Sequence, residues 1–135
     1  MLVRFINNNC LHNSMDKERA QILVRISISL LFLWFGINQL INPDYFTGYL
    51  PDFILTSNFA SQMLLINGLF ETILGMLLLL GIFVRITSLI LSIHLLIITF
   101  SLGYNDIAVR DFILTLITFS ICIGGADKWC LIKKY

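Results

Sequence analysis

Two ionisable residues inside apolar stretches are the first candidates for chemistry. Glu71 and His94 each stand in a long run of apolar residues. Counting at about 1.5 Å per residue places both near the middle of a membrane-spanning helix, at a similar depth. An ionisable group in hydrocarbon is costly, and a carboxylate there must be paired or protonated. The sequence therefore predicts a functional role for Glu71, whereas His94 fits a ligand contact and a structural histidine equally well.

Polar residues at helical spacing extend this candidate site. Asn67 stands one turn before Glu71 on the same helix face, and Gly75 stands one turn after it. At Gly75 a neighbouring backbone can approach closely. With Glu71 and His94 at its floor, the predicted ligand pocket opens outward. Its other predicted residues come from the first and fourth apolar stretches: Arg25, Asn38, Gln39, Arg110 and Asp111.

The uncharged polar residues also have a structural interpretation, because interhelical hydrogen bonds hold thin transmembrane helices together. Asp111, Thr115, Thr118 and Cys122 follow helical spacing along one face. The residues that the structural interpretation fits are Asn38, Gln39, Asn67, Thr115 and Thr118.

The arginines have alternatives of their own. Arg110 would neutralise Asp111 or Glu71, so a structural ion pair is the alternative role for Glu71. Arg25 would either extend to lipid phosphates or reach inward. Arg85 is interpreted as a topology anchor.

The elements that must position these residues follow from composition and length. Of the 135 residues, 58% are hydrophobic and 13% are charged, about half the charged share of a soluble domain. Four stretches have the length of a spanning helix: about 20–41, 60–83, 84–103 and 107–126. The predicted fold class is all-α, an integral membrane four-helix bundle over residues 20–128, with tails at 1–19 and 129–135. Met15, just before a charged run, is an alternative native start, with residues 1–14 an upstream extension.

Loops and flanking charges predict the topology. The first loop contains both prolines and no Lys or Arg, and its aromatic residues suit a segment that caps the bundle at the membrane interface. Tight turns are expected near Gly81 and Gly103. Cytoplasmic segments carry the excess of Lys and Arg, so both termini and the second loop are predicted to be cytoplasmic. The basic residues behind this prediction are Arg4, Lys17, Arg19, Arg85, Lys128, Lys133 and Lys134.

Several function classes are set aside. The net charge of +1 comes without a basic stripe, so no nucleic-acid partner is expected. Cys10, Cys122 and Cys130 form no CxxC and no zinc-ligand spacing, which favours reduced thiols and no metal site. A single intramembrane histidine does not suit a haem held between two axial histidines.

Short motifs, taken in order, carry a family resemblance. The run from Glu71 through Gly75 and a leucine stretch to Gly81 and Arg85 resembles the second helix of the DoxX family. Arg25, then Phe35-Gly36 and Gln39-Leu40, resembles its first helix. The loop Asn42-Pro43-Asp44-Tyr45-Phe46 with Pro51, and the pair Arg110-Asp111, resemble later parts of the same family. Gln39 departs from the pattern because many members have lysine there, and Gly124-Gly125-Ala126-Asp127 is a loose version of the family's glycine-rich end.

The resemblance implies a multi-pass protein of a prokaryotic plasma membrane, whose partners are the bilayer and a redox enzyme or a second copy of the chain. Some relatives are similar to the membrane subunit of a thiosulfate:quinone oxidoreductase, and others to partners of enzymes of oxidative and thiol stress. Three functions remain open: an accessory or binding subunit, a quinone-linked oxidoreductase subunit, and a small transporter or channel. In the second, Glu71 and His94 would handle protons beside a quinone, the cofactor that the resemblance suggests.

Overall fold

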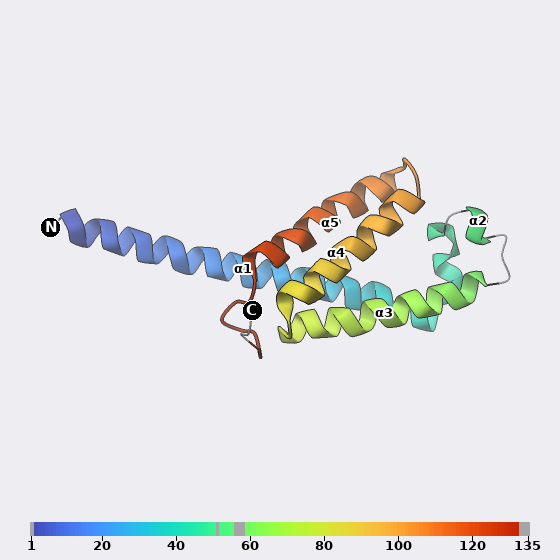
Figure 1. Cartoon of the computed structure of the whole chain (residues 1–135), viewed down its shortest axis with the longest axis horizontal. Coiled ribbons are helices and arrows are strands. Elements are labelled where there is room, and N and C mark those ends of the chain that lie inside the picture. Colours follow the sequence, from blue (N-terminus) through green and yellow to red (C-terminus); the bar gives the residue numbers. More distant parts are fainter. Residues whose placement is uncertain (1, 51, 56–58, 133–135) are drawn as a thin grey trace.

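The computed structural model describes residues 2–50, 52–55 and 59–132, and side chains from residue 15 onward except at 51–53, 56–58 and 133–135. This described part contains helices and connecting turns without a β-strand (Figure 1). The expectations for Arg4, Cys10, Lys133 and Lys134 fall on side chains outside the described residues. The elements are α1 (Leu2–Ile41), η1 (Pro43–Tyr49), α2 (Asp52–Leu55), α3 (Ala60–Leu80), α4 (Val84–Ser101) and α5 (Asp106–Gly124).

Four of these helices are long and apolar enough to cross a membrane. They are the Met15–Ile41 part of α1, and α3, α4 and α5. Only 28–39% of the most apolar window of each helix is buried inside the protein, so most of its apolar surface is left for lipid. The predicted all-α four-helix membrane fold is therefore confirmed.

The helices α3, α4 and α5 end two or three residues before the ends expected from the sequence because turn residues stop them, whereas α1 ends at Ile41. Gly81 adopts a left-handed conformation (φ +70°), and the N–H of Ile82 bonds back to the carbonyl of Leu77 at 2.9 Å. This arrangement closes α3 in the way that glycine commonly ends a helix. Phe83 is also left-handed (φ +47°) and starts α4 directly, which gives the tight turn predicted at this position.

The four spans form two closely packed helix pairs, α1 with α3 and α4 with α5. Figure 1 shows the pairs meeting at one end and diverging toward the other. We name the first the junction end, where the α3–α4 turn and the segment after α5 lie. The second is the open end, where η1 and the α4–α5 connection lie.

Glycines let α1 and α3 approach closely. A Cβ added to Gly36 would lie 2.8 Å from the carbonyl oxygen of Gly68, and one added to Gly75 would lie 3.2 Å from the Cβ of Phe32. Both distances are tighter than ordinary van der Waals contact, so side chains there would push the helices apart. The close backbone approach predicted at Gly75 is therefore present.

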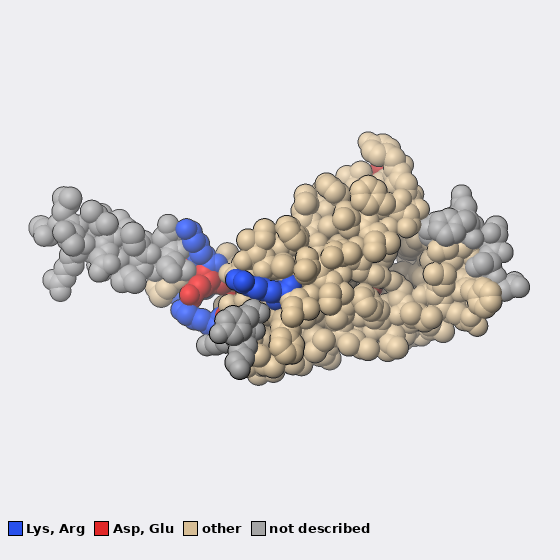
Figure 2. All heavy atoms as spheres, viewed as in Figure 1, with Lys and Arg blue, Asp and Glu red and all other residues tan. Residues whose placement is uncertain are grey.

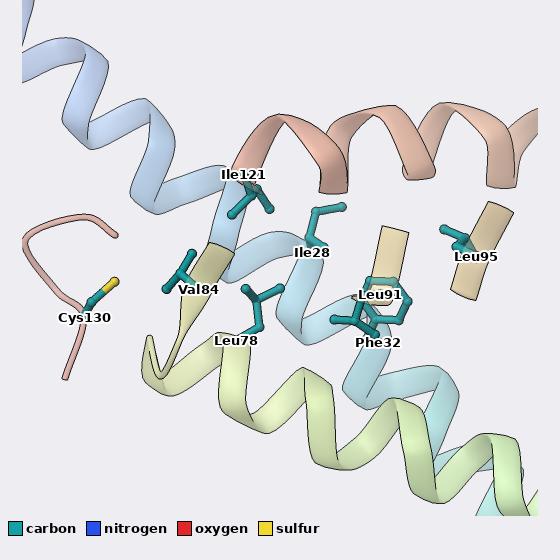
Figure 3. Packing of buried hydrophobic residues seen from close by; sticks show 8 residues of the cluster. All are labelled: Ile28, Phe32, Leu78, Val84, Leu91, Leu95, Ile121 and Cys130. Atoms are coloured by element: carbon teal, nitrogen blue, oxygen red, sulfur yellow. The ribbon is translucent and has the colours of Figure 1, made fainter. Parts of the chain in front are cut away.

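The hydrophobic core gathers at the middle and the junction end (Figure 3). Phe32 and Leu78 join α1 to α3, while Leu91 and Ile121 bring in α4 and α5. Because all four spans contribute, this cluster fixes the relative position of the two pairs. The members of the cluster are Ile28, Phe32, Leu78, Val84, Leu91, Leu95, Ile121 and Cys130.

The first loop folds back over the open end. Phe46 of η1 is buried, and its ring lies 6.1 Å from the ring of Phe35 and 5.7 Å from that of Tyr49. Such edge-on and tilted ring pairs stabilise the segment beyond simple burial. The loop thereby closes the open end from one side, as a capping segment would.

Candidate functional site

A pocket of about 270 Å³ lies between the two helix pairs at the open end. Its walls are mainly apolar, from Phe35 and Phe46 on one side to Leu95 and Leu114 on the other. Ligand pockets of proteins combine such walls with a few placed polar groups. The predicted site residues that line it are Gln39, Asn67, Glu71, Arg110 and Asp111.

A chain of polar side chains connects α1 to the base of this pocket. The Asn67 amide nitrogen donates to the Gln39 side-chain oxygen at 2.8 Å and to Glu71 Oε1 at 3.2 Å. Gln39 and Asn67 therefore form the interhelical bond that the structural interpretation predicted. They also orient one carboxylate oxygen of Glu71, a residue that is only 4% exposed.

The structure brings Glu71 and His94 face to face across α3 and α4. His94 Nε2 lies 3.5 Å from Glu71 Oε1, close enough for ionic attraction when the ring is protonated. Within the described part, neither His94 Nε2 nor Glu71 Oε2 has a hydrogen-bond partner, although both atoms are buried. Buried polar atoms are nearly always satisfied, so these two indicate a site that completes its bonding with something else. The ring of Phe70, which belongs to α3, packs beside the His94 imidazole, with 4.8 Å between the two ring centroids.

The mouth of the pocket carries its charged pair. Arg110 Nε donates to Asp111 Oδ1 at 2.9 Å, so of the two predicted partners Asp111 is the one that it neutralises. The guanidinium also lies 5.6 Å from the centroid of the Phe35 ring, within range of a cation–π interaction. Glu71 is left without an arginine among the contacts of the described residues, so the alternative of a structural ion pair with an arginine is not what the structure shows.

Three residues expected to join helices bond within their own helix instead. Asn38 donates to the carbonyl of Trp34, Thr115 to that of Asp111, and Thr118 to that of Leu114. A carbonyl one turn back is always within reach of such side chains, and no water competes for it in lipid. Asn38 and His94 also lie outside the pocket lining, contrary to their predicted places there.

One bond between α4 and α5 was not foreseen. Ser92 donates to the carbonyl oxygen of Thr115 at 3.2 Å. A small residue among larger apolar ones was the sequence signal for such a contact.

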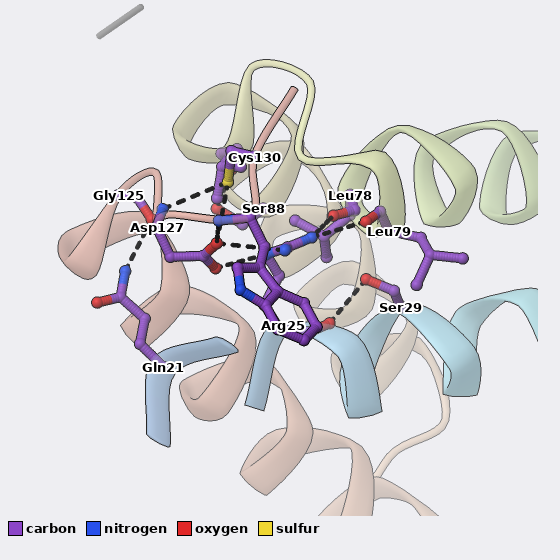
Figure 4. A network of polar contacts seen from close by, with 11 residues as sticks. Gln21, Arg25, Ser29, Leu78, Leu79, Ser88, Gly125, Asp127 and Cys130 are labelled. Carbon is purple, nitrogen blue, oxygen red and sulfur yellow. Dashed lines mark hydrogen bonds and ion pairs between the residues drawn. The ribbon is translucent and has the colours of Figure 1, made fainter. Parts of the chain in front are cut away.

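Arg25 lies at the junction end, far along α1 from the pocket, and both sequence interpretations of it were incomplete (Figure 4). It is 1% exposed. Its Nε donates to Asp127 Oδ2 at 2.7 Å and its Nη2 to Oδ1 at 3.3 Å. Its Nη1 donates to the carbonyls of Leu78 and Leu79, both at 2.7 Å, which caps the end of α3. Arg25 does reach inward, but to a structural site rather than to the ligand pocket.

Asp127 is the partner that the sequence analysis did not single out. Burial alone would raise the pKa of its carboxyl. The hydrogen bond from Arg25, the backbone N–H of Trp129 at 2.9 Å and the charge of Arg25 outweigh that effect and hold the pKa below its ordinary value. Burial raises the pKa of the neighbouring Cys130 thiol, which keeps it in the neutral form. The sequence signal for this ion pair was an acidic residue just after the last span, at the same membrane depth as an arginine in the first span.

The lowered pKa of Asp127 predicts a pH dependence. A carboxyl whose pKa is lower in the folded protein stabilises the fold above its unfolded pKa of about 3.9, and this contribution is lost as pH falls through the lower folded value. The difference in melting temperature between the wild type and Asp127→Asn should therefore be full at neutral pH and shrink below about pH 4. Thermal unfolding in detergent at a series of pH values measures it. An unchanged difference down to the acid limit would contradict the role of the ionised carboxylate.

The DoxX family model matches residues 20–103, which is more than half of the chain. The protein belongs to the DoxX family. The match to DoxX contains Arg25, Gln39, Asn67, Glu71 and His94, and it ends before α5. The search of curated proteins and the search of solved structures each gave no match.

Proposed function

We propose that this DoxX protein is a membrane-embedded binding subunit of a redox or thiol-stress system, and that its pocket holds the head of a quinone-class molecule. The observation that carries the proposal is a pair of buried atoms without hydrogen-bond partners, Glu71 Oε2 and His94 Nε2. Glu71 lines the pocket, and His94 contacts Glu71 from outside the pocket lining. A bound molecule with a carbonyl or hydroxyl group would give these atoms the partners that they lack.

The shape and lining of the pocket favour a lipid-soluble ligand. The walls are apolar and the two helix pairs diverge around the pocket, so an apolar tail would extend between them toward lipid. A quinone carbonyl accepts a hydrogen bond, which protonated Glu71 or the imidazole of His94 would donate. The pocket size of about 270 Å³ suits a single ring head rather than a whole long-tailed carrier.

The role as a subunit follows from the kind of chemistry that these side chains perform. Glu71 and His94 exchange protons, and quinone reduction also requires electrons. A partner enzyme would have to supply these electrons. With that enzyme attached, the binding subunit would act as a quinone-linked oxidoreductase subunit through the same site. Affinity purification from the native membrane would recover that enzyme, and repeated recovery of this chain alone would count against the partner.

The orientation that we propose has both termini in the cytoplasm of a prokaryotic cell. In Figure 2 the Lys and Arg side chains gather at the junction end. The open end holds Arg110, already paired with Asp111. Cytoplasmic loops carry the excess of Lys and Arg, so this distribution supports a pocket that opens on the opposite, outer half of the membrane.

Removing the polar atoms of the Glu71–His94 pair is the direct test. Glu71→Met and His94→Phe keep comparable bulk and delete the donors. Each should weaken binding of a short-tailed quinone about five- to hundredfold, the effect of losing a buried hydrogen-bond partner. Titration of the detergent-purified protein, followed by ultraviolet absorption and by mass spectrometry of extracted quinone, measures the affinity.

A matched control separates the site from general charge effects. Asp106→Asn removes an exposed carboxylate at the same end of the bundle, outside the pocket lining. It should bind quinone as the wild type does. Wild-type affinity in Glu71→Met and His94→Phe, or no quinone bound by the wild type in quinone-supplied membranes, would reject the proposed ligand.

A further inference from the structure

A second hollow, at the junction end, lies on the outer surface of α1 and is separate from the quinone pocket. It is a groove of about 470 Å³ between α1 and the segment that follows α5. We propose that this groove binds one anionic phospholipid. The groove shares no lining residue with the pocket at the open end, so the two proposals stand or fall independently.

The apolar half of the groove is built for acyl chains. Ile22, Leu23 and Ile26 line it, and all three lie within the membrane-spanning part of α1. Leu23 is 67% exposed, so its side chain is offered to a neighbour rather than packed in the core. A soluble ligand would have no access to these residues at membrane depth, whereas lipid chains are already there.

The other half of the groove carries positive charge and an interfacial aromatic. Arg19 lies one turn before Ile22, about 4.5 Å along the helix axis. Lys128 and Trp129 face it from the segment after α5, and Trp129 is 70% exposed. Tryptophan favours the headgroup level of a membrane, where a phosphate would meet both cations. The groove therefore offers an apolar surface to the acyl chains and two cations to the phosphate of one lipid.

The cations of this groove have carboxylate neighbours that a phosphate can replace. Lys128 pairs with Glu18, and Arg19 lies 3.9 Å from Asp16. These side chains are largely exposed, and ion pairs of this kind contribute little. The groove lining holds two cations, Arg19 and Lys128, and one carboxylate, Glu18, so its net charge is positive. This excess attracts an anionic headgroup rather than a zwitterionic one.

Native mass spectrometry of the full-length protein tests the proposal. The delipidated protein is titrated with phosphatidylglycerol and, separately, with phosphatidylcholine of the same chains. One phosphatidylglycerol should be retained in preference to phosphatidylcholine. The variant Arg19→Gln/Lys128→Gln should lose about 30-fold in affinity for it, from about fivefold per cation.

Two single substitutions sharpen the result. Lys17→Gln removes the same charge from the neighbouring position, outside the groove lining, and should leave the affinity nearly unchanged. Glu18→Gln removes the carboxylate that competes for Lys128 and should strengthen phosphatidylglycerol binding, a gain that misfolding does not produce. Equal retention of the two lipids would overturn the proposal. A loss in Lys17→Gln as large as in the double variant, or the absence of a gain in Glu18→Gln, would overturn it too.

Discussion

Replacing Arg25 with methionine should lower the free energy of unfolding by about 3–5 kcal/mol, the range for removing one partner of a buried ion pair. The substitution leaves the Asp127 carboxylate buried with no cation and frees the carbonyls of Leu78 and Leu79 at the end of α3. Thermal or denaturant unfolding of the detergent-purified protein measures the loss.

Two further variants separate the ion pair from simple loss of bulk. Arg85→Met removes an exposed arginine at the same end and should change stability little. Arg25→Met/Asp127→Leu removes both charges and should recover part of the stability lost in Arg25→Met, because no unpaired charge remains. Equal stability of Arg25→Met and Arg85→Met would contradict the structural role of the guanidinium.

Adding side chains at Gly36 should separate α1 from α3. A Cβ at this position would lie 2.7 Å from the backbone nitrogen of Thr72 and 2.8 Å from the carbonyl oxygen of Gly68. Backbone atoms of a packed helix move little, so Gly36→Ala should cost about 1–3 kcal/mol although alanine favours a helix, and Gly36→Leu should cost more. Unfolding measurements in the same detergent quantify the loss.

The control for this prediction is another glycine of the same chain. A Cβ on Gly48 of η1 would meet nothing within 4 Å, so Gly48→Ala should be close to neutral. Because Gln39 sits one turn beyond Gly36, separation of the helices should also weaken the Asn67–Gln39 bond and with it quinone binding. A fully stable Gly36→Ala would show that the two helices adjust to the added methyl group.

Counting residues along the spans predicted the depth of the site because depth depends only on helix rise. Glu71 and His94 were expected at one level, and the structure places them 3.5 Å apart. Residue counting does not predict which side of its helix each of these two residues faces. The apolar residues of α3 and α4 surround both helices almost evenly, so the sequence had too little periodicity to orient them.

Arg25 shows where sequence reasoning failed. The sequence analysis placed Asp127 in a glycine-rich end of the bundle and residues 129–135 in a tail, and neither assignment named a partner for Arg25. In the structure this segment turns back, and the N–H of Leu131 bonds to the carbonyl of Leu80 at 3.2 Å. Contacts between an early helix and a segment 102 residues later depend on the path of the backbone, which local patterns do not encode.

The separation of Arg25 from Asp127 along the chain also orders the steps of assembly. Residues are synthesised from the N-terminus, so α1 and α3 can pair through their glycines long before Asp127 exists. During that interval Arg25 can already donate to the carbonyls of Leu78 and Leu79, but its charge has no carboxylate. The late arrival of Asp127 would then neutralise a charge buried between α1 and α3 and hold the segment after α5 against both helices.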